Sequence, residues 1–416
     1  MNVSKGLSLA ILFATALLTA SVASAADTVE GGEKKGITFE DIMGKGNSLK
    51  FYGFVRLDAI YDDSRMSNSQ TPYYVLSEDK AAGGKKDDDV FTMHTRLSRL
   101  GIDFNGGQVP NLANGKVGGK FEIDFQNGGS ESRAIPRYRQ MYLKIKWDEL
   151  SVLAGQTWDI ISPLIPSVNN DTLMWNTGNL GDRRAQLRLA YEPKVWDGAL
   201  SFMGGIGLTG AVDAKDLDGD GVRDGEDSGE PQVQARIGYS AATPWAVGNK
   251  TEIGIYGVYL REDAQTKGDY EGKVVGVDLT IPLSQAVALR GEAWAGQDLS
   301  DLRGGIGQGL NTTSGKEIES KGGWIEVLYK HRSNSLALGW TIDDPDNDEL
   351  PSSGTIAANG TTSDGRTKNE AYYISERFKA GSGVEIGIDY LYWQTDYKTL
   401  KTGTDNRVNL VFQYNF

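Results

Sequence analysis

Residues 216–227, DLDGDGVRDGED, have the residue types and the spacing of a calcium-binding loop. In such loops, carboxylates at positions 1, 3, 5, 9 and 12 and a backbone carbonyl at position 7 surround the ion, and Gly at position 6 makes a sharp turn. Positions 1, 3, 5, 9 and 12 are Asp216, Asp218, Asp220, Asp224 and Asp227. Val222 stands at position 7 and Gly221 at position 6. We therefore expect a calcium ion (Ca²⁺) to bind here, and the alternative is a solvated acidic loop.

Two departures from the usual calcium loop limit what this one could do. Position 12 is Asp227 rather than the longer Glu, so bidentate reach to the ion is reduced. We also expect no helices on either side of the loop, which excludes the opening movement of a calcium sensor.

Few other residues could carry chemistry. The 416-residue chain has no Cys and two His, so thiolate chemistry is excluded and a His-rich metal site has little material. Residues 205–210, GIGLTG, match a dinucleotide-binding spacing but lead into an acidic loop and not a helix. We therefore expect no enzyme activity. The formal net charge of −13 repels phosphates, so nucleic acid is excluded as a partner.

The N-terminus has the pattern of an export signal. Lys5 precedes an apolar run that ends in Ala23-Ser24-Ala25, which predicts a signal peptide over residues 1–25. A short periplasmic segment over residues 26–48 follows. No later stretch approaches 18 consecutive apolar residues, so we expect no transmembrane helix.

From residue 49 onward, apolar and polar residues alternate with the period of a β-strand. One example is the final stretch, NRVNLVFQYNF, where Val408, Leu410 and Phe412 share a face. Many segments are about 10 to 13 residues long, which suits tilted membrane strands better than soluble sheets. The sixteen predicted strands are 49–61, 91–105, 116–126, 137–147, 150–158, 183–192, 199–209, 231–240, 250–262, 272–282, 286–297, 322–331, 334–343, 369–379, 383–395 and 405–416.

Connections between these strands alternate between long and short. The long ones are 62–90, 127–136, 159–182, 210–230, 263–271, 298–321, 344–368 and 396–404. Long loops at one rim and short turns at the other are typical of outer-membrane barrels, with the long loops outside the cell. The sequence predicts an all-β fold, a transmembrane antiparallel barrel over residues 49–416, in the bacterial outer membrane. Sixteen strands enclose a water-filled channel.

Polar side chains on the inner face are candidates for the pore lining. Alternation places Arg56, Arg184, Arg188, Arg236 and Arg290 there, together with acids that include Asp58 and Glu122. In the second strand, a bulge near Ser98 would turn both Arg96 and Arg99 inward. In the fourth strand the pattern is ambiguous, because alternation groups Arg139 with apolar residues such as Met141 and Leu143.

Several stretches resemble Gram-negative trimeric porins, in particular the DcaP-like branch. They are SRLGIDFNG, GKVGGKFEIDFQ, YRQMYLKIKW, LSVLAGQTWDIISP and the C-terminal NLVFQYNF. The resemblance implies a homotrimer, and it implies that the third loop, 159–182, folds into the lumen as a constriction carrying Asp159 and Asp171. It also implies basic side chains opposite that loop, at positions matching Arg56, Arg99, Arg139 and Arg184. Members of this branch favour dicarboxylates and other small anions.

Two functions of different classes follow. The first is an outer-membrane porin for passive diffusion of small hydrophilic solutes, with a preference for small anions such as dicarboxylates over a weakly selective pore. The second is a barrel whose calcium-binding outer loops serve surface adhesion or lipopolysaccharide bridging, with the pore incidental. Outer-membrane lipid and lipopolysaccharide are expected partners of either.

Overall fold

The computed structural model describes residues 47–416 except 80–87, 130–132, 266–267 and 353–364. The predicted signal peptide and nearly all of the predicted segment 26–48 lie outside these residues. The described chain belongs to one compact unit, Gly46–Phe416.

Nearly all of the regular secondary structure in the described part is β-strand. The spanning strands are β1 (Ser48–Asp62), β2 with β3 (Val90–His94, Arg99–Val109), β4 (Gly115–Asp124), β5 (Arg137–Lys146), β6 (Leu150–Trp158), β7 (Arg183–Tyr191), β9 (Gly198–Gly207), β10 (Gln232–Ala242), β11 (Lys250–Asp263), β12 (Asp269–Pro282), β13 (Val287–Gln297), β16 (Glu319–His331), β17 (Asn334–Pro345), β18 (Arg366–Gly381), β19 (Val384–Tyr397) and β20 (Gly403–Asn415). The sheet has 18 segments, but β2 continues into β3 and the two-residue β8 (Lys194–Val195) only extends a turn, which leaves 16 spanning strands. The predicted strand number and fold class are therefore confirmed.

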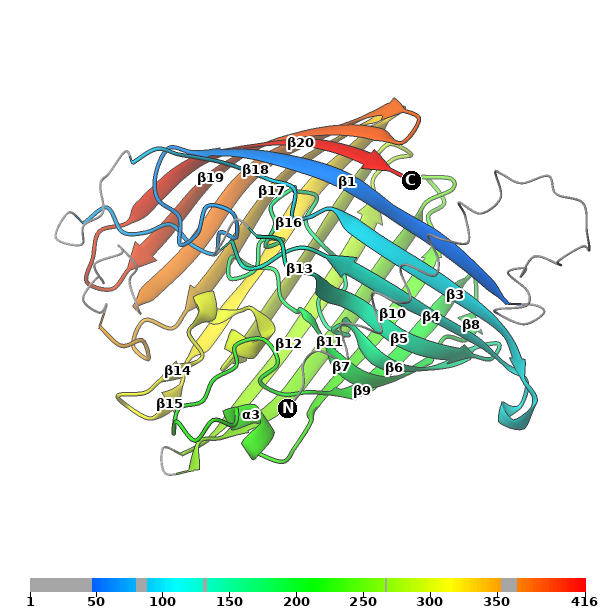
Figure 1. Ribbon diagram of the computed structural model, residues 1–416, viewed down its shortest axis with the longest axis horizontal. Coiled ribbons are helices and arrows are strands. Elements are labelled where there is room, and N and C mark those ends of the chain that lie inside the picture. The colour runs from blue at the N-terminus through cyan, green and yellow to red at the C-terminus, as the bar shows by residue number, and fades with distance from the viewer. Residues whose placement is uncertain (1–46, 80–87, 130–132, 266–267, 353–364) are drawn as a thin grey trace, which may run out of the picture. The chain divides into compact units, whose positions relative to one another are not determined.

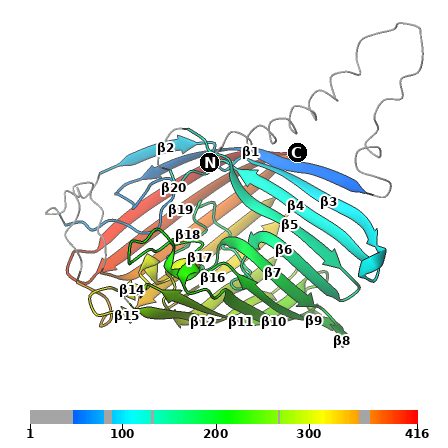
Figure 2. The ribbon, with the colours of Figure 1, turned by 60° about the horizontal axis from the view of Figure 1, so that its bottom comes forward.

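The sheet closes on itself by antiparallel pairing of its first and last strands (Figures 1 and 2). Val55 of β1 lies opposite Tyr414 of β20, and the backbone N–H of Gly53 donates to the carbonyl of Phe416 over 3.2 Å. The other side of β1 pairs with β2 and β3. Every spanning strand thus has a neighbour on both sides, so its backbone N–H and C=O groups are satisfied without water.

The outer face of the barrel carries the apolar half of each alternating strand. Val55, Leu143 and Val275 expose 60%, 60% and 61% of their surface, whereas polar neighbours such as Asp58 and Glu122 are buried on the inner face. A closed barrel with an apolar outer surface spans a membrane, and barrels of this kind belong to the bacterial outer membrane. No helix among the described residues is long and apolar enough to cross a membrane.

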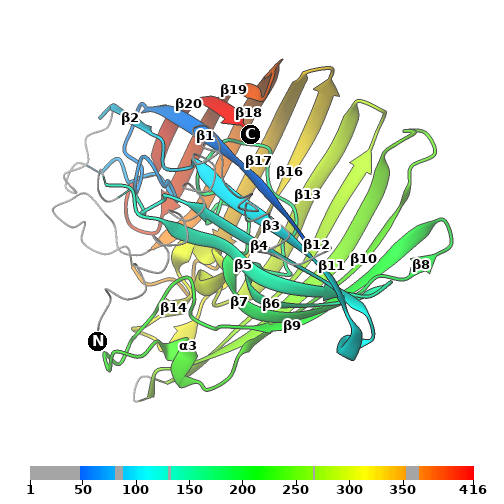
Figure 3. The same cartoon turned by 45° about the vertical axis from the view of Figure 1, so that its right-hand side comes forward.

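The connections at one end of the barrel are mostly long and those at the other end are short (Figure 3). Two predicted long loops are shorter than expected, because the strands extend beyond the predicted bounds and leave only 264–268 and 398–402. The long connections contain the remaining small elements: α3 (Asp224–Asp227), η4 (Ser300–Leu302), η5 (Gly305–Gly307), β14 (Leu310–Asn311) and β15 (Lys316–Glu317). The turn between β3 and β4 contains η2 (Pro110–Leu112).

Candidate functional site

The connection 159–182 lies inside the barrel, held by carboxylates on the inner wall. The backbone N–H of Leu164 donates to Glu292 of β13 over 2.8 Å, and that of Ser167 donates to Glu326 of β16 over 2.8 Å. The backbone N–H of Asn169 donates to Asp389 of β19 over 2.9 Å. Since the loop leaves from β6, it crosses the lumen to reach these three strands.

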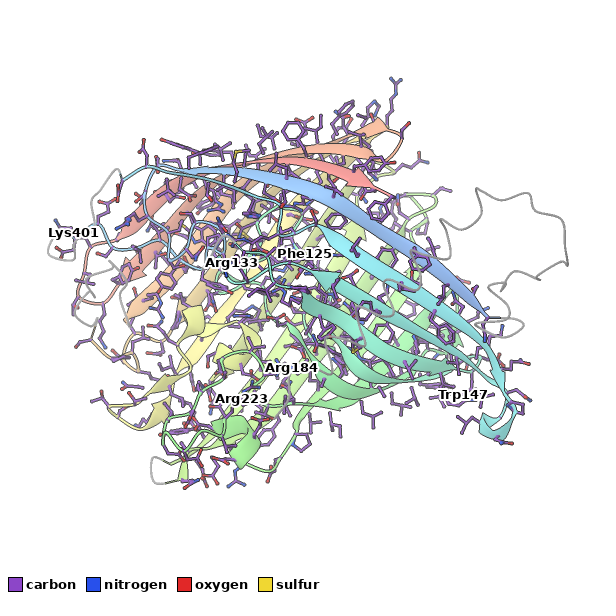
Figure 4. All side chains as sticks on the ribbon, viewed as in Figure 1. Phe125, Arg133, Trp147, Arg184, Arg223 and Lys401 are labelled. Atoms are coloured by element: carbon purple, nitrogen blue, oxygen red, sulfur yellow. The ribbon has the colours of Figure 1, made fainter. Side chains whose placement is uncertain are left out.

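The two ends of this loop are fastened by arginines. Arg184, labelled in Figure 4, donates to Asp159 over 2.8 Å and to Asp301 of η4 over 2.6 Å. Its side chain is fully buried. Arg303 pairs with Asp182 over 2.8 Å. Arg184 and Asp159 were expected to face the pore, but the structure corrects this expectation. They neutralise one another, because a buried charge must be paired.

A cavity of about 600 Å³ lies between the loop and the inner wall. Eight arginines and one lysine line it: Arg56, Arg99, Arg137, Arg139, Arg183, Arg290, Arg303, Arg377 and Lys330. Asp171, contributed by the loop, is the one carboxylate among its described lining residues. The surface facing the solute is therefore strongly basic.

Carboxylates behind the arginines hold several of the guanidinium groups in place. Arg139 donates to Glu122 over 2.9 Å and to Asp124 over 2.8 Å, and Arg137 pairs with Asp124 over 2.7 Å. Asp124 is fully buried and Glu122 nearly so. Because these acids lie behind the arginines, the positive ends face the cavity while the wall stays close to neutral.

Two more arginines, on β1 and β13, repeat this arrangement. Arg290 lies 2.8 Å from Glu326, and Arg56 donates from Nε to Asp58 over 2.9 Å. Glu326 and Asp58 are both buried. The predicted pore residues Arg56, Arg99, Arg139 and Arg290 thus line one cavity, whereas Asp58 and Glu122 lie behind it as their counterions.

Two irregularities in the strands bring arginines to the cavity. The second strand is interrupted at Thr95–Ser98, where the N–H of Ser98 donates to the carbonyl of Thr95 over 3.0 Å. Beyond this turn, Arg99 lines the cavity, and Arg96 is buried outside its lining. The predicted irregularity near Ser98 is therefore present as a turn between β2 and β3.

The second irregularity is a bulge in β5 opposite Glu122 and Ile123, which pair with Gln140 and Tyr138. Both Arg139 and Gln140 are buried, while Tyr138 and Met141 on either side expose 57% and 42% of their surface. A bulge adds one residue to a strand, so two successive side chains point inward. This resolves the conflict between alternation and the placement of Arg139.

Two further predicted pore residues, besides Arg96 and Arg184, lie outside this cavity. Arg188 donates to the Gln186 side chain and the Trp158 carbonyl, and Arg236 donates twice to Asp278, over 2.8 and 2.6 Å. Five basic residues of the cavity were not among those predicted from the sequence: Arg137, Arg183, Arg303, Arg377 and Lys330. Alternation around Ile374 could have found Arg377, but nothing in the sequence indicates that Arg303, in a loop, turns inward.

Asp171 is placed to modulate the charge of the cavity. Its carboxylate accepts a hydrogen bond from the Gln126 side chain. Burial raises the pKa of Asp171 to about 6, although the nearby Arg137 acts in the opposite direction. The cavity therefore gains a negative charge between mildly acidic and neutral pH.

The predicted calcium loop lies at the long-loop end, where Figure 4 marks Arg223. Carboxylate oxygens of Asp216, Asp218 and Asp224 lie within 4.8 Å of one another, and so do those of Asp218, Asp220 and Asp227. A one-turn helix, α3, forms the last four residues of the loop itself, Asp224–Asp227, and the elements on either side of the loop are the strands β9 and β10. Four residues are too few for a sensor-type helix, so the exclusion of an opening movement stands.

The donor atoms of this loop are suited to a cation. Oδ2 of Asp218 and Oδ2 of Asp227 are buried and have no hydrogen-bond partner among the described residues. Partial desolvation, followed by the charges of Asp220 and Asp218, raises the pKa of Asp227. Carboxylate oxygens gathered in this way are the hard ligands that Ca²⁺ prefers.

A closed 16-stranded barrel with a loop folded into a polar lumen defines the porin class of outer-membrane proteins. Solved structures with this fold include the outer membrane channel DcaP of Acinetobacter baumannii, with 20% sequence identity and a TM-score of 0.68. The matched region covers 89% of this chain and 98% of the DcaP chain. An anion-selective porin from Comamonas acidovorans is 10% identical at a TM-score of 0.55 and covers 89% and 100%. OmpT of Vibrio cholerae is 14% identical at a TM-score of 0.52 and covers 89% and 98%.

These likenesses confirm the predicted resemblance at the level of the fold. No family model matches the chain, and no curated protein matches its sequence. At such low identity the likeness extends to the fold alone.

Proposed function

We propose that this protein is an outer-membrane porin through which small hydrophilic solutes diffuse, with a preference for small anions such as dicarboxylates. One observation carries the proposal: the cavity beside the inward loop is lined by eight arginines and one lysine against a single carboxylate. Rings of basic side chains are how anion pores attract their ions. The acids behind the arginines are buried, so they orient the guanidinium groups without repelling a passing anion.

The chemistry of arginine favours carboxylates within this class. A guanidinium presents a planar fork of donors that pairs with a carboxylate through two hydrogen bonds. Arg99 and Arg139 line the cavity from one part of the wall, and Arg290 and Arg377 line it from β13 and β18. A dicarboxylate could therefore place one carboxylate against Arg99 and Arg139 and the other against Arg290 and Arg377. The porin from Comamonas acidovorans is described as anion-selective, which agrees with this assignment.

Reconstitution in planar bilayers tests the proposal. Under a KCl gradient, the zero-current potential should have the sign of an anion-preferring pore, and Arg99→Gln with Arg139→Gln should reduce it. Lys273→Gln with Lys321→Gln is the matched control, because both lysines lie on the exposed outer face. Absence of conductance, or a potential of the opposite sign, would contradict the proposal.

A homotrimer in contact with outer-membrane lipid and lipopolysaccharide is part of this proposal, as is the absence of enzyme activity. A structure of OmpT of Vibrio cholerae, with a TM-score of 0.51, is described as a trimer form. The apolar outer face offers surface both to lipid and to further copies of the chain. Mass measurement in detergent should give three copies per particle, and a monomer would contradict this part.

We also propose that Ca²⁺ binds the loop 216–227, through Asp216, Asp218, Asp220, Asp224, Asp227 and the Val222 carbonyl. The gathered carboxylates and their two orphaned oxygens support the assignment. Isothermal titration should show binding in the millimolar range that Asp218→Ala with Asp220→Ala abolishes. A calcium-bound rim also favours the second candidate function, adhesion or lipopolysaccharide bridging, which becomes the better one if the barrel binds calcium but conducts no ions.

A further inference from the structure

A second group of cations lies on the inner wall near the short-turn end. Lys50 of β1, Lys116 of β4, and Lys144 and Lys146 of β5 line a hollow of about 790 Å³. Leu143, directly before Lys144, exposes 60% of its surface on the outer face, and alternation along β5 therefore points Lys144 and Lys146 into the barrel. This cluster, called here the lysine hollow, shares no lining residue with the arginine cavity.

The register of the strands sets like charges against each other in the lysine hollow. Lys116 lies directly opposite Lys146, and Lys144 lies opposite Gly118, one diagonal away from Lys116. Like charges directly opposite each other destabilise a sheet. Gly118 has no side chain to separate them. The fold therefore holds three ammonium groups close together on one small area of wall.

The two acids that line the hollow, Asp103 and Asp148, offset only part of this charge. Asp103 lies opposite Lys50 in the sheet, but its ion pair over 2.8 Å is with Lys120, which is not one of the four lysines. Among the described residues, no ion pair joins Lys50, Lys116, Lys144 or Lys146 to a carboxylate. The situation differs from that of the arginines Arg56, Arg99, Arg137, Arg139 and Arg290, each of which has a carboxylate beside it.

We propose that the lysine hollow is a second anion-binding site, in series with the arginine cavity, for small anions that carry two or three negative charges. This inference rests on the proposed porin function only because citrate must reach the lysine hollow through an open pore. β4 and β5 carry lysines near the short turn and then Glu122, Asp124, Arg139 and Arg137 further along, so both sites lie on one wall. In outer-membrane barrels the short turns face the periplasm, which places this site at the inner mouth.

The chemistry of lysine fixes the kind of selectivity expected. An ammonium group is a compact charge on a flexible stem, without the fixed fork of arginine. The lysine hollow should therefore rank anions by charge and not by shape, so that citrate binds more tightly than sulfate and sulfate more tightly than chloride. The arginine cavity should instead favour carboxylates for their geometry.

Single-channel recording with citrate as the probe tests the proposal. The chain has no native Cys, so Asn347→Cys at an exposed position of a long loop, reacted with a membrane-impermeant thiol reagent, reports the orientation of each inserted channel. Citrate added on the short-turn side should reduce the current at lower concentration than citrate added on the loop side. The triple variant carries Lys116→Gln, Lys144→Gln and Lys146→Gln. In this variant, the citrate concentration that halves the current from the short-turn side should rise roughly fivefold or more.

Three controls separate charge from other effects. Lys273→Gln with Lys321→Gln removes two lysines from the outer face and should leave the block unchanged, whereas Lys→Arg at 116, 144 and 146 should preserve it. Lys146→Gln alone should unfold at no lower temperature than the native chain, because it relieves the repulsion with Lys116. A block that the triple Gln variant leaves unchanged, or that is equal from both sides, would overturn the proposal. The zero-current potential reports on the proposed anion preference separately, since it is measured without citrate.

Discussion

The guanidinium of Arg184 on β7 lies 2.6 Å from the carboxylate of Asp301, which belongs to the connection after β13. The same arginine also binds Asp159 at the start of the inward loop. One fully buried cation thus joins the barrel wall, the inward loop and a second long connection. Its removal would leave two buried carboxylates facing each other.

Arg184→Leu should therefore destabilise the barrel more than the loss of an ordinary ion pair. Breaking a buried pair by removing one partner costs about 3–5 kcal/mol, because the other charge stays buried. Denaturant unfolding in detergent measures the change, and open-channel noise should rise as the loop loosens. Arg261→Leu is the control, since Arg261 pairs with Glu230 and Asp269 at an exposed rim. Equal stability of the two variants would show that the Arg184 cluster does not anchor the loop.

The anion preference should depend on pH through Asp171. Burial raises the pKa of this carboxyl to about 6, so it is neutral at pH 5 and negative at pH 7.5. Loss of that negative charge makes the cavity more basic, and the anion preference should therefore increase as the pH falls through 6. Zero-current potentials at the two pH values measure the change. Asp171→Asn should show the pH 5 behaviour throughout, and a pH dependence that persists in this variant would assign it to another group.

Calcium should protect the loop 216–227 from proteolysis. Arg223 lies within this loop and is partly exposed, so trypsin can cleave after it. Bound Ca²⁺ would order the loop, and cleavage at Arg223 should be slower in millimolar calcium than in chelator. The rate in Asp218→Ala with Asp220→Ala should be fast and independent of calcium. If calcium leaves the cleavage rate of the native chain unchanged, it does not order this loop.

Gly178 should tolerate no side chain. A Cβ there would lie 2.2 Å from the carbonyl of Gly323 and 2.7 Å from that of Ile342, and the Gly178 φ is +121°. Gly178→Ala must push the inward loop off the wall and lengthen the 2.7 Å hydrogen bond from Trp294. Overpacking of this kind costs about 1–3 kcal/mol and should change the single-channel conductance. Gly229→Ala, at a φ of +64° with open space around it, is the matched control, and equal effects would attribute the loss to backbone strain alone.

The barrel itself could be predicted because a strand with one face in lipid and one in water must alternate. The residue type alone therefore indicates that Val55 faces the lipid and Arg56 faces the lumen. The interior of the pore depends on contacts that no local pattern contains. Arg184 and Arg290 both follow the inward alternation, but one is sealed by two loop carboxylates and the other lines the cavity. Arg303 reaches the cavity only because its connection folds inward, which its sequence does not indicate.

The bulge at Arg139 shows the same limit at the level of a single strand. One extra residue between Tyr138 and Gln140 breaks the alternation of this strand. The sequence does not show where that extra residue lies, so alternation alone could not decide which face Arg139 occupies. Resemblance to known porins placed Arg139 inward where periodicity could not. The lysines of β5 obey the alternation, but their opposition to Lys116 appears only once the register with β4 is known.

The anchoring of the inward loop has a consequence for how this pore could diversify. Glu292, Glu326 and Asp389 each accept a hydrogen bond from a main-chain N–H, that of Leu164, Ser167 and Asn169 respectively. The side chains of Ser167 and Asn169 donate a second bond to Glu326 and Asp389. The intervening Ile165, Pro166 and Val168 line the cavity. The hydrogen bonds that fix the position of the constriction therefore do not use the side chains of Ile165, Pro166 or Val168. New side chains at these sites could retune which solutes pass while the scaffold that aims them stays in place, which makes this short segment a natural target for directed redesign of permeability.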